Sequence, residues 1–290
     1  MDNKKKIVIA YHSIDGDNEK AVRGSFPITM ERFKKQVDLI KSKGWKFDFL
    51  SNINKPIEEN TVYITGDDGT VDWVRNVLPF CEENKIPTQT AIITGPWLNN
   101  PIYPIAHRVQ IALTIKDREY NLLKLTEEEK EYIDKVYKYE TDSTRRYVKG
   151  CCNLLYDNDG AEEVLGTPGY EEALELSRRF AEIEEYKGYE YAEYGVHTVT
   201  HRAFDGDVDK YIDEEIIPCL NMLLKNKLKA VKYFTLPMRP MFNSTVLQLV
   251  EPLKSLGFDG IVDGNGHYDG KSFIIPRIDA KQVEEYFEGR

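Results

Sequence analysis

The stretch TVYITGDDG, residues 61–69, joins a run typical of a buried strand to a strongly charged end. Val62 and Ile64 are β-branched residues, which favour strands. Asp67, Asp68 and Gly69 follow at once, and Asp-Gly pairs are also common in ordinary turns. Because adjacent residues at a strand end point in different directions, the two carboxylates could take different tasks.

Strands of this kind alternate with helical patterns along the chain. The first helix has Thr29 as its expected N-cap and Gly44 as its expected end, and Pro79 must bend or restart the second helix. The pattern predicts strands at 6–12, 61–69, 88–95, 189–197, 230–237, 258–263 and 272–278, with helices at 27–45, 72–87, 208–227 and 244–257. Such alternation predicts a parallel α/β architecture, with polar residues gathered just after the strands.

The alternation is interrupted between about residues 97 and 190. This part is charged, rich in tyrosine and mostly helical in pattern, and Thr126 with Glu129 forms a capping box. We therefore expect one domain over residues 1–290 that carries a mainly helical insertion at about 97–190. The segment 157–166 has a weak similarity to a calcium loop, which we reject because apolar or glycine residues stand at ligand positions.

Charge and composition exclude several classes of partner. The 290 residues carry a net charge of −10, and such an acidic chain is a poor partner for nucleic acid. No stretch approaches the length of a membrane span, and the apolar run after the basic start is too short for a signal peptide. The four cysteines form no C-x-x-C pair and are expected to be reduced thiols, which predicts a cytoplasmic protein. The oligomeric state is left open.

The stretch HTVTH, residues 197–201, brings two imidazoles within reach of one another. By themselves His197 and His201 could equally be polar residues at a strand end, because zinc needs three or four ligands. Together with one carboxylate from residues 67–68 they make a set that leaves positions open for water and substrate. The second carboxylate could then act as a general base, as in metal-assisted hydrolysis.

These two motifs resemble those of the polysaccharide deacetylases, the NodB-homology or family 4 carbohydrate esterases. TGDDG resembles their T-F-D-D-G motif, and HTVTH fits H-[ST]-x-x-H without a mismatch. The resemblance covers most of the chain outside 97–190 and implies a distorted (β/α)7-type barrel. It implies Asp67 as the catalytic base, and Asp68, His197 and His201 as ligands of one divalent metal ion, expected to be zinc. The implied substrate is an N-acetylated amino sugar.

Three departures from the family pattern stand out. Gly66 replaces the usual phenylalanine, which removes a bulky side chain beside the base. LPMRPMFN, residues 236–243, aligns in two ways with the third motif, whose arginine would make Arg239 a catalytic residue. The fifth motif, Leu-x-His, supplies the family's general acid and is missing; IIPRID, residues 274–279, stands in its place. Arg277 in that segment is expected to bind an anion or a carboxylate, since it cannot deliver a proton at neutral pH.

Three other histidines are candidates for a role at the site. His267 could replace the missing acid but is more typical of a solvated turn. His12 ends the first strand and could face the same site, but a buried structural histidine at a strand end is the better explanation. His107 lies in the insertion and is not expected to be catalytic. The function that follows is a metal-dependent N-deacetylase. The alternatives are a carbohydrate-binding relative without activity and a hydrolase of another C–N bond, such as a sugar deformylase or an amidase.

Overall fold

The computed structural model describes residues 4–15, 28–115, 125–138, 146, 150–151, 169–238, 246–264 and 266–289. Arg239 and the segment 157–166 lie outside the described residues, so their predicted roles are not addressed by the structure. Within the described part of the chain, no helix is both long enough and apolar enough to cross a bilayer. Three of the four cysteines, Cys81, Cys151 and Cys219, are buried free thiols.

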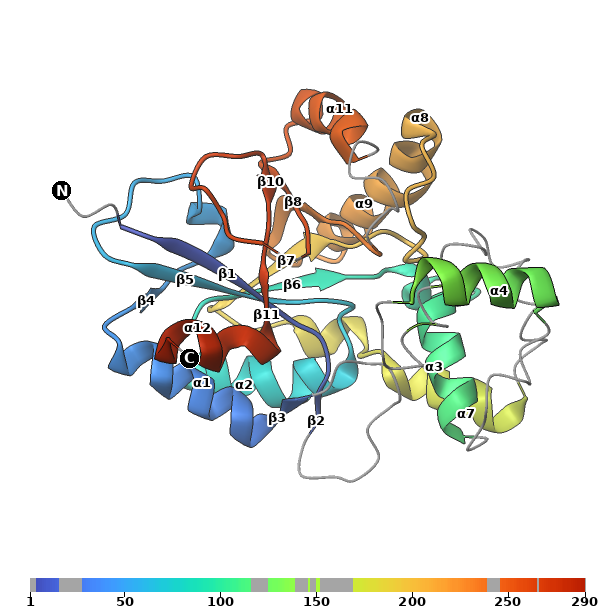
Figure 1. The fold of residues 1–290 in the computed structure, drawn as a ribbon, viewed down its shortest axis with the longest axis horizontal. Coiled ribbons are helices and arrows are strands. Elements are labelled where there is room, and N and C mark those ends of the chain that lie inside the picture. The colour runs from blue at the N-terminus through green and yellow to red at the C-terminus, as the bar shows by residue number, and fades with distance from the viewer. Residues whose placement is uncertain are drawn as a thin grey trace.

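A parallel sheet forms the centre of the protein (Figure 1). In the described residues it contains nine strands: β1 (Lys6–Tyr11), β4 (Lys46–Phe47), β5 (Thr61–Gly66), β6 (Thr88–Ile92), β7 (Ala192–Val196), β8 (Ala230–Thr235), β9 (Gly260–Val262), β10 (Ile274–Ile275) and β11 (Ile278–Asp279). The spatial order is β10-β9-β8-β7-β6-β5-β1-β11, and the short β4 pairs with the first part of β5. Every pairing is parallel, so the carboxyl ends of the strands meet at one edge.

The two ends of this sheet are neighbours in sequence. β10 pairs with β9 and β11 pairs with β1, yet only Pro276 and Arg277 separate them in the chain. Proline has no N–H for the ladder, which suits a break between two half-strands. The sheet therefore curls into a distorted (β/α) barrel, as expected. It differs from seven regular strands because β4 is added and the last strand is divided in two.

Helices cover the curled sheet on both sides (Figure 1). On one side lie α1 (Met30–Ser42), α2 (Leu78–Glu83) and α12 (Val283–Glu288), and on the other α8 (Val208–Tyr211), α9 (Ile217–Lys225) and α11 (Val250–Ser255). Thr29 caps α1 through the Arg32 N–H, and the apolar face predicted for this helix buries Phe33, Val37 and Ile40 completely.

Two helices restart at a proline. Residues Trp73–Val77 (η2) form a π-helical turn before α2, which has Pro79 in its first turn. Ile212–Ile216 (η6) is a second π-helical turn before α9, which has Pro218 in its first turn. A proline inside a helix removes one i→i−4 hydrogen bond, and a wider turn accommodates its ring. The restart predicted at Pro79 is confirmed.

The described part of the predicted insertion is mainly helical. It contains α3 (Ile105–Ile115), α4 (Glu127–Val136) and α7 (Tyr170–Arg179), followed by the short 3₁₀ helix η5 (Ile183–Tyr186). The capping box of Thr126 and Glu129 is present. Because α3 follows β6, this group of helices lies at the edge where the carboxyl ends of the strands gather (Figure 1). The remaining short elements are β2 (Ile14–Asp15), paired with β3 (Ile28–Thr29), and the 3₁₀ turns Leu50–Asn52, Gly95–Trp97, Leu247–Leu249 and Ala280–Gln282.

Candidate active site

The two motifs meet at the carboxyl edge of the sheet. Asp67 and Asp68 directly follow β5, His197 directly follows β7, and β6 pairs with both strands. The parallel register aligns Gly66 with Thr90 of β6. The residues predicted as ligands are thereby brought together by the sheet itself.

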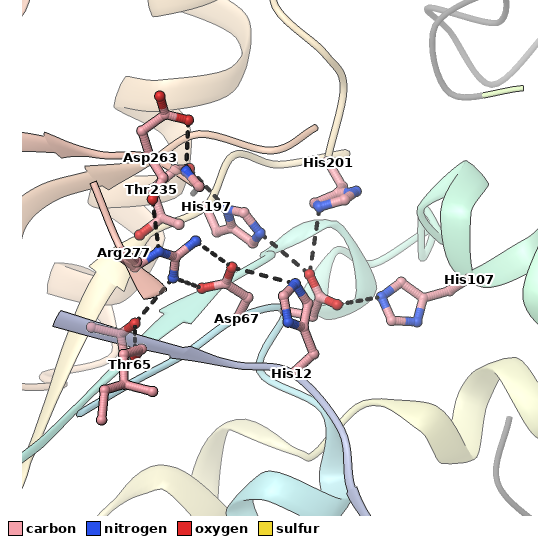
Figure 2. A network of polar contacts seen from close by, with 12 residues as sticks. His12, Thr65, Asp67, His107, His197, His201, Thr235, Asp263 and Arg277 are labelled. Carbon is pink, nitrogen blue, oxygen red and sulfur yellow. Dashed lines mark hydrogen bonds and ion pairs between the residues drawn. The ribbon is translucent and has the colours of Figure 1, made fainter. Parts of the chain in front are cut away.

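Asp68, His197 and His201 form a group that could hold a metal ion. Asp68 Oδ1 lies 3.3 Å from His197 Nε2 and 3.5 Å from His201 Nε2 (Figure 2). The potential ligand atoms all lie within 4.8 Å of one another. Ligands bound about 2.1 Å from a tetrahedral zinc ion are separated by about 3.4 Å. The spacing of these three side chains therefore fits one divalent ion.

A backbone contact orients the ring of His197. Its Nδ1 lies 2.8 Å from the carbonyl oxygen of Thr235, at the end of β8, and the side chain is 2% exposed. A carbonyl only accepts, so Nδ1 carries a proton, and in the neutral ring Nε2 has the lone pair on the side of Asp68. Burial lowers the pKa of His197, but Asp68 and Asp67 outweigh burial and raise it. Histidines that bind metals commonly donate their other N–H to such a carbonyl.

The loop before His201 has an uncommon backbone. Thr198 and His201 have φ of 71° and 61°, in the left-handed region that residues other than glycine seldom occupy. Such a φ is especially rare for a β-branched residue such as Thr198. Thr198 Oγ1 accepts from the His201 N–H at 2.8 Å. The buried Glu215 of η6 accepts from the backbone N–H groups of Val199 and Thr200 at 2.9 and 2.8 Å. These bonds hold the loop in the conformation that presents His201 to Asp68.

The ring of His201 is suited to a neutral state. Burial lowers its pKa to about 3, and the neighbouring His197 and His107 act in the same direction while Asp68 opposes them. Its Nδ1 is buried without a hydrogen-bond partner among the described residues. A neutral imidazole with a lone pair on Nε2 is the form that binds a metal.

Asp67 forms a two-point salt bridge with Arg277, which lies between β10 and β11 in the chain. Arg277 Nη1 and Nη2 donate to the two carboxylate oxygens at 2.6 and 2.7 Å, and both side chains are almost fully buried. Burial raises the pKa of Asp67, but the Arg277 charge and hydrogen bonds outweigh it and hold the pKa below its usual value. The prediction that Arg277 binds a carboxylate is confirmed. Arg277 is itself fixed by the Asp263 carbonyl and Thr65 Oγ1, both at 3.0 Å.

His12 lies over the same carboxylate. Its Nε2 is 3.6 Å from Asp67 Oδ2, and its side chain is 30% exposed (Figure 2). The expectation of a buried structural histidine was wrong in this respect. The end of β1 lies beside the end of β5, because Tyr11 pairs with Gly66. That long-range pairing could not be read from the local sequence.

Trp73 explains the glycine beside the base. A Cβ at Gly66 would come within 2.4 Å of the Trp73 ring. The indole is fully buried and donates from Nε1 to Thr90 Oγ1 at 2.9 Å. The bulk expected from the family's phenylalanine is thus supplied by a side chain from the following helix, and a side chain at position 66 has no room.

His107 reaches the site from α3, in the predicted insertion, and the sequence did not indicate this. Its Nε2 lies 3.2 Å from Asp68 Oδ2, and its side chain is 1% exposed (Figure 2). Burial lowers its pKa although Asp68 opposes this effect. Asp68 itself has a pKa well below its usual value, since His107, His197 and His201 outweigh the effect of its burial.

His267 lies elsewhere. It is exposed, packs near Tyr286 of α12 at 5.5 Å between ring centroids, and lines a surface hollow with Lys4–Ile7 at the start of β1. That is the amino end of the barrel, opposite the site. His267 therefore cannot replace the missing acid, and its interpretation as a solvated turn residue agrees with its exposure.

Comparison with known proteins finds similarity in structure only. No family model and no curated protein matches the sequence. The fold resembles a de-N-acetylase from Aggregatibacter actinomycetemcomitans, with 12% identity, a TM-score of 0.57, and 98% of this chain and 100% of that chain covered. It also resembles IcaB from Ammonifex degensii, with 14% identity, a TM-score of 0.55, and 99% of this chain and 97% of that chain covered. A third similar structure is the Streptococcus pyogenes deacetylase PplD in complex with acetate, with 13% identity, a TM-score of 0.52, and 95% of this chain and 92% of that chain covered. The chain thus has the fold of polysaccharide deacetylases over nearly its whole length.

Proposed function

We propose that this protein is a metal-dependent N-deacetylase acting on an N-acetylated amino sugar. The observation that carries the proposal is the group of Asp68, His197 and His201 beside an ionised, arginine-held Asp67. This arrangement lies at the carboxyl edge of a barrel shared with deacetylases. The solved neighbours are named as deacetylases, and the shared fold supports the same activity for this protein.

Asp68, His197 and His201 would hold one divalent ion, for which zinc is the first candidate because two imidazoles and a carboxylate suit it. When bound, such an ion polarises an amide carbonyl and lowers the pKa of a water molecule. The backbone of this chain contributes by fixing the ligands, through Thr235 for His197 and through Glu215 for the loop before His201.

Asp67 would take the proton of the attacking water. Arg277 keeps it ionised and occupies one acceptor direction of each oxygen, and a carboxylate has about four in total. The same grip weakens Asp67 as a base, since it lowers the pKa. His12, 3.6 Å from Oδ2 and partly exposed, would give a proton to the leaving amine in place of the absent fifth-motif histidine.

A second candidate is a carbohydrate-binding relative without activity. It is favoured by Arg277, which stands in the segment where the family has its acid and cannot release a proton. A hydrolase of another C–N bond, such as a sugar deformylase or an amidase, uses the same site and differs only in the acyl group or the amine.

The test is the release of acetate together with free amine from N-acetylglucosamine and its oligomers by zinc-loaded protein. We expect stoichiometric release by the native protein. Asp67→Asn should lose about 10²- to 10⁴-fold in rate, because the proton transfer is lost and a general base contributes that range. Zinc content should stay unchanged in this variant. Saccharide binding without any acetate would support the second candidate, and full activity of Asp67→Asn would refute the role of Asp67.

A further inference from the structure

We propose that His107, from the inserted helices, is a positioning residue that holds one oxygen of Asp68 so that the other faces the metal. The proposal rests on the metal site assigned above. It gives the insertion a role in metal binding, beyond that of a covering segment. His107 would not itself be a ligand.

The two oxygens of Asp68 face different partners. Oδ1 lies near His197 Nε2 and His201 Nε2, at 3.3 and 3.5 Å, whereas Oδ2 lies 3.2 Å from His107 Nε2 (Figure 2). An ion between Oδ1 and the two ligand histidines would leave Oδ2 without a metal contact. Carboxylates that bind metals are usually hydrogen-bonded through such remaining positions.

The second ring nitrogen of His107 fixes what Nε2 can do. Arg179 Nε lies 3.4 Å from His107 Nδ1 and donates to it. A guanidinium only donates, so Nδ1 must present its lone pair and the neutral ring must carry its proton on Nε2. Nε2 then carries a proton 3.2 Å from Asp68 Oδ2, a close contact whose angle lies outside that of a well-formed hydrogen bond, and it has no lone pair to offer an ion. This geometry separates His107 from His197 and His201, whose Nε2 atoms face Asp68 Oδ1, the oxygen assigned to the ion.

Arg179 is itself anchored to the barrel. This last residue of α7 is 7% exposed; its Nη1 lies 3.6 Å from Asp72 Oδ1, and its Nη2 is 3.5 Å from Ser13 Oγ. Asp72 also accepts from the Ile14 N–H at 2.9 Å. The orientation of His107 is therefore set by residues after β1 and β5.

The insertion also holds the turn that follows Asp68. Tyr186 donates its hydroxyl to the Gly69 carbonyl oxygen, and Phe180 forms an antiparallel bridge with Thr70. The Phe180 ring packs edge-on against His107, with 4.9 Å between centroids. Three consecutive positions, Asp68 to Thr70, thus each contact a residue of the predicted insertion. Asp68 has φ of 71°, and these contacts stabilise that uncommon conformation.

The experiment compares the native protein with His107→Gln and His107→Met. Both replacements have about the reach of histidine, but only the glutamine amide can donate to Asp68 Oδ2. Each metal-free protein is titrated with Co²⁺ while its d–d absorption is followed, and Zn²⁺ affinity is measured by competition with a chromophoric chelator. His267→Met is the control for loss of an exposed histidine distant from the site.

We expect His107→Met to bind both ions about 10- to 100-fold more weakly, the range found for residues that support metal ligands. His107→Gln should stay within about threefold of the native protein, and all absorption bands should keep their shape because the ligands are unchanged. Native affinity in His107→Met would overturn the proposal. An altered band shape in His107→Gln would also overturn it, because His107 would then be a ligand.

Two further outcomes are distinguishable. If His107→Met shows no cooperative melting transition, His107→Gln alone decides, and a loss above about threefold contradicts the proposal. If the native protein binds neither ion, the metal site of the proposed function is wrong. If the native protein binds metal and substitutions at position 107 leave its affinity unchanged, only the role of His107 is wrong.

Discussion

Asp67 and Asp68 are adjacent in the chain, but their carboxylates contact different kinds of side chain. Asp67 points to the Arg277 guanidinium, and Asp68 points to three imidazoles. The positive φ of Asp68 turns the backbone between them, so the two carboxylates cannot share one site. Both pKa values are held low, by a cation for Asp67 and by the histidines for Asp68, and both groups remain acceptors at neutral pH.

His201 should make the metal-free protein sensitive to acid. Its folded pKa of about 3 lies below the usual histidine value, so the unfolded chain binds a proton between about pH 6.5 and 3 that the folded protein does not. Its contribution to stability is present above pH 6.5 and is lost as the pH falls, with a slope of up to about 1.4 kcal/mol per pH unit.

The measurement is the free energy of unfolding in urea at pH 7.0, 6.0 and 5.0, after metal removal. His201→Gln should show a smaller loss on acidification than the native protein. His267→Gln, at an exposed position, is the matched control and should follow the native curve. Equal slopes for all three proteins would mean that His201 is protonated in the folded state.

The loop after β7 depends on a single carboxylate in another element. Glu215 accepts two backbone N–H groups and the Thr200 hydroxyl, at 2.9, 2.8 and 2.6 Å. In Glu215→Ala the buried Val199 N–H and the partly buried N–H and hydroxyl of Thr200 lose their partner, and a fully buried unsatisfied group costs about 1–3 kcal/mol. We expect a total loss of about 2–4 kcal/mol in unfolding free energy, and weaker zinc binding because His201 is no longer held.

Glu215→Gln provides the contrast. Its amide oxygen can accept from the two backbone groups while its NH₂ donates to Thr200 Oγ1, so we expect most of the stability and zinc affinity to remain. Urea unfolding and a zinc competition titration on both variants check this. If the alanine variant kept native zinc affinity, the loop would be held by other contacts.

The features of helices and strands that depend on interactions between nearby residues were predicted best from the sequence. The apolar period of α1, its Thr29 cap, the restart at Pro79 and the capping box at Thr126 are set by neighbours within a few positions. The pairing of β10 and β11 with strands from opposite ends of the sheet was not predicted, because the single strand predicted at 272–278 covers β10 and the first residue of β11. The division of the strand at Pro276 follows from the closure of the barrel, which pairs β10 with β9 and β11 with β1.

At the scale of the whole molecule, Arg277 connects the last strand to the first motif. It lies 210 residues from Asp67 in the chain, and it also binds Thr65 of β5 and the carbonyl that follows β9. Such long-range contacts, like those of His12 and His107, follow from the order of the strands and from the placement of the insertion. Asp68, His197 and His201 could be named from the sequence as candidate ligands because their motifs are local and resemble a known family, and the structure brings these three side chains together.

Removing Arg277 should destabilise the barrel. Arg277→Met leaves Asp67 as a buried charge without its partner, and breaking a buried pair in this way costs about 3–5 kcal/mol. The double variant Asp67→Asn/Arg277→Met should recover part of that loss, because neither charge then remains. Urea unfolding of the two single variants and the double variant measures the coupling. Simple addition of the two losses would contradict a direct dependence of Asp67 on Arg277.

The most direct test of the account is the metal content of the protein. Protein purified without chelator, and then loaded with zinc and desalted, is measured by mass spectrometry beside His201→Ala and the control His267→Ala. The account predicts about one equivalent of a divalent metal in the native protein and the control, and a large loss in His201→Ala, which lacks one of three ligands. No metal in the native protein, or equal metal in His201→Ala, would contradict it.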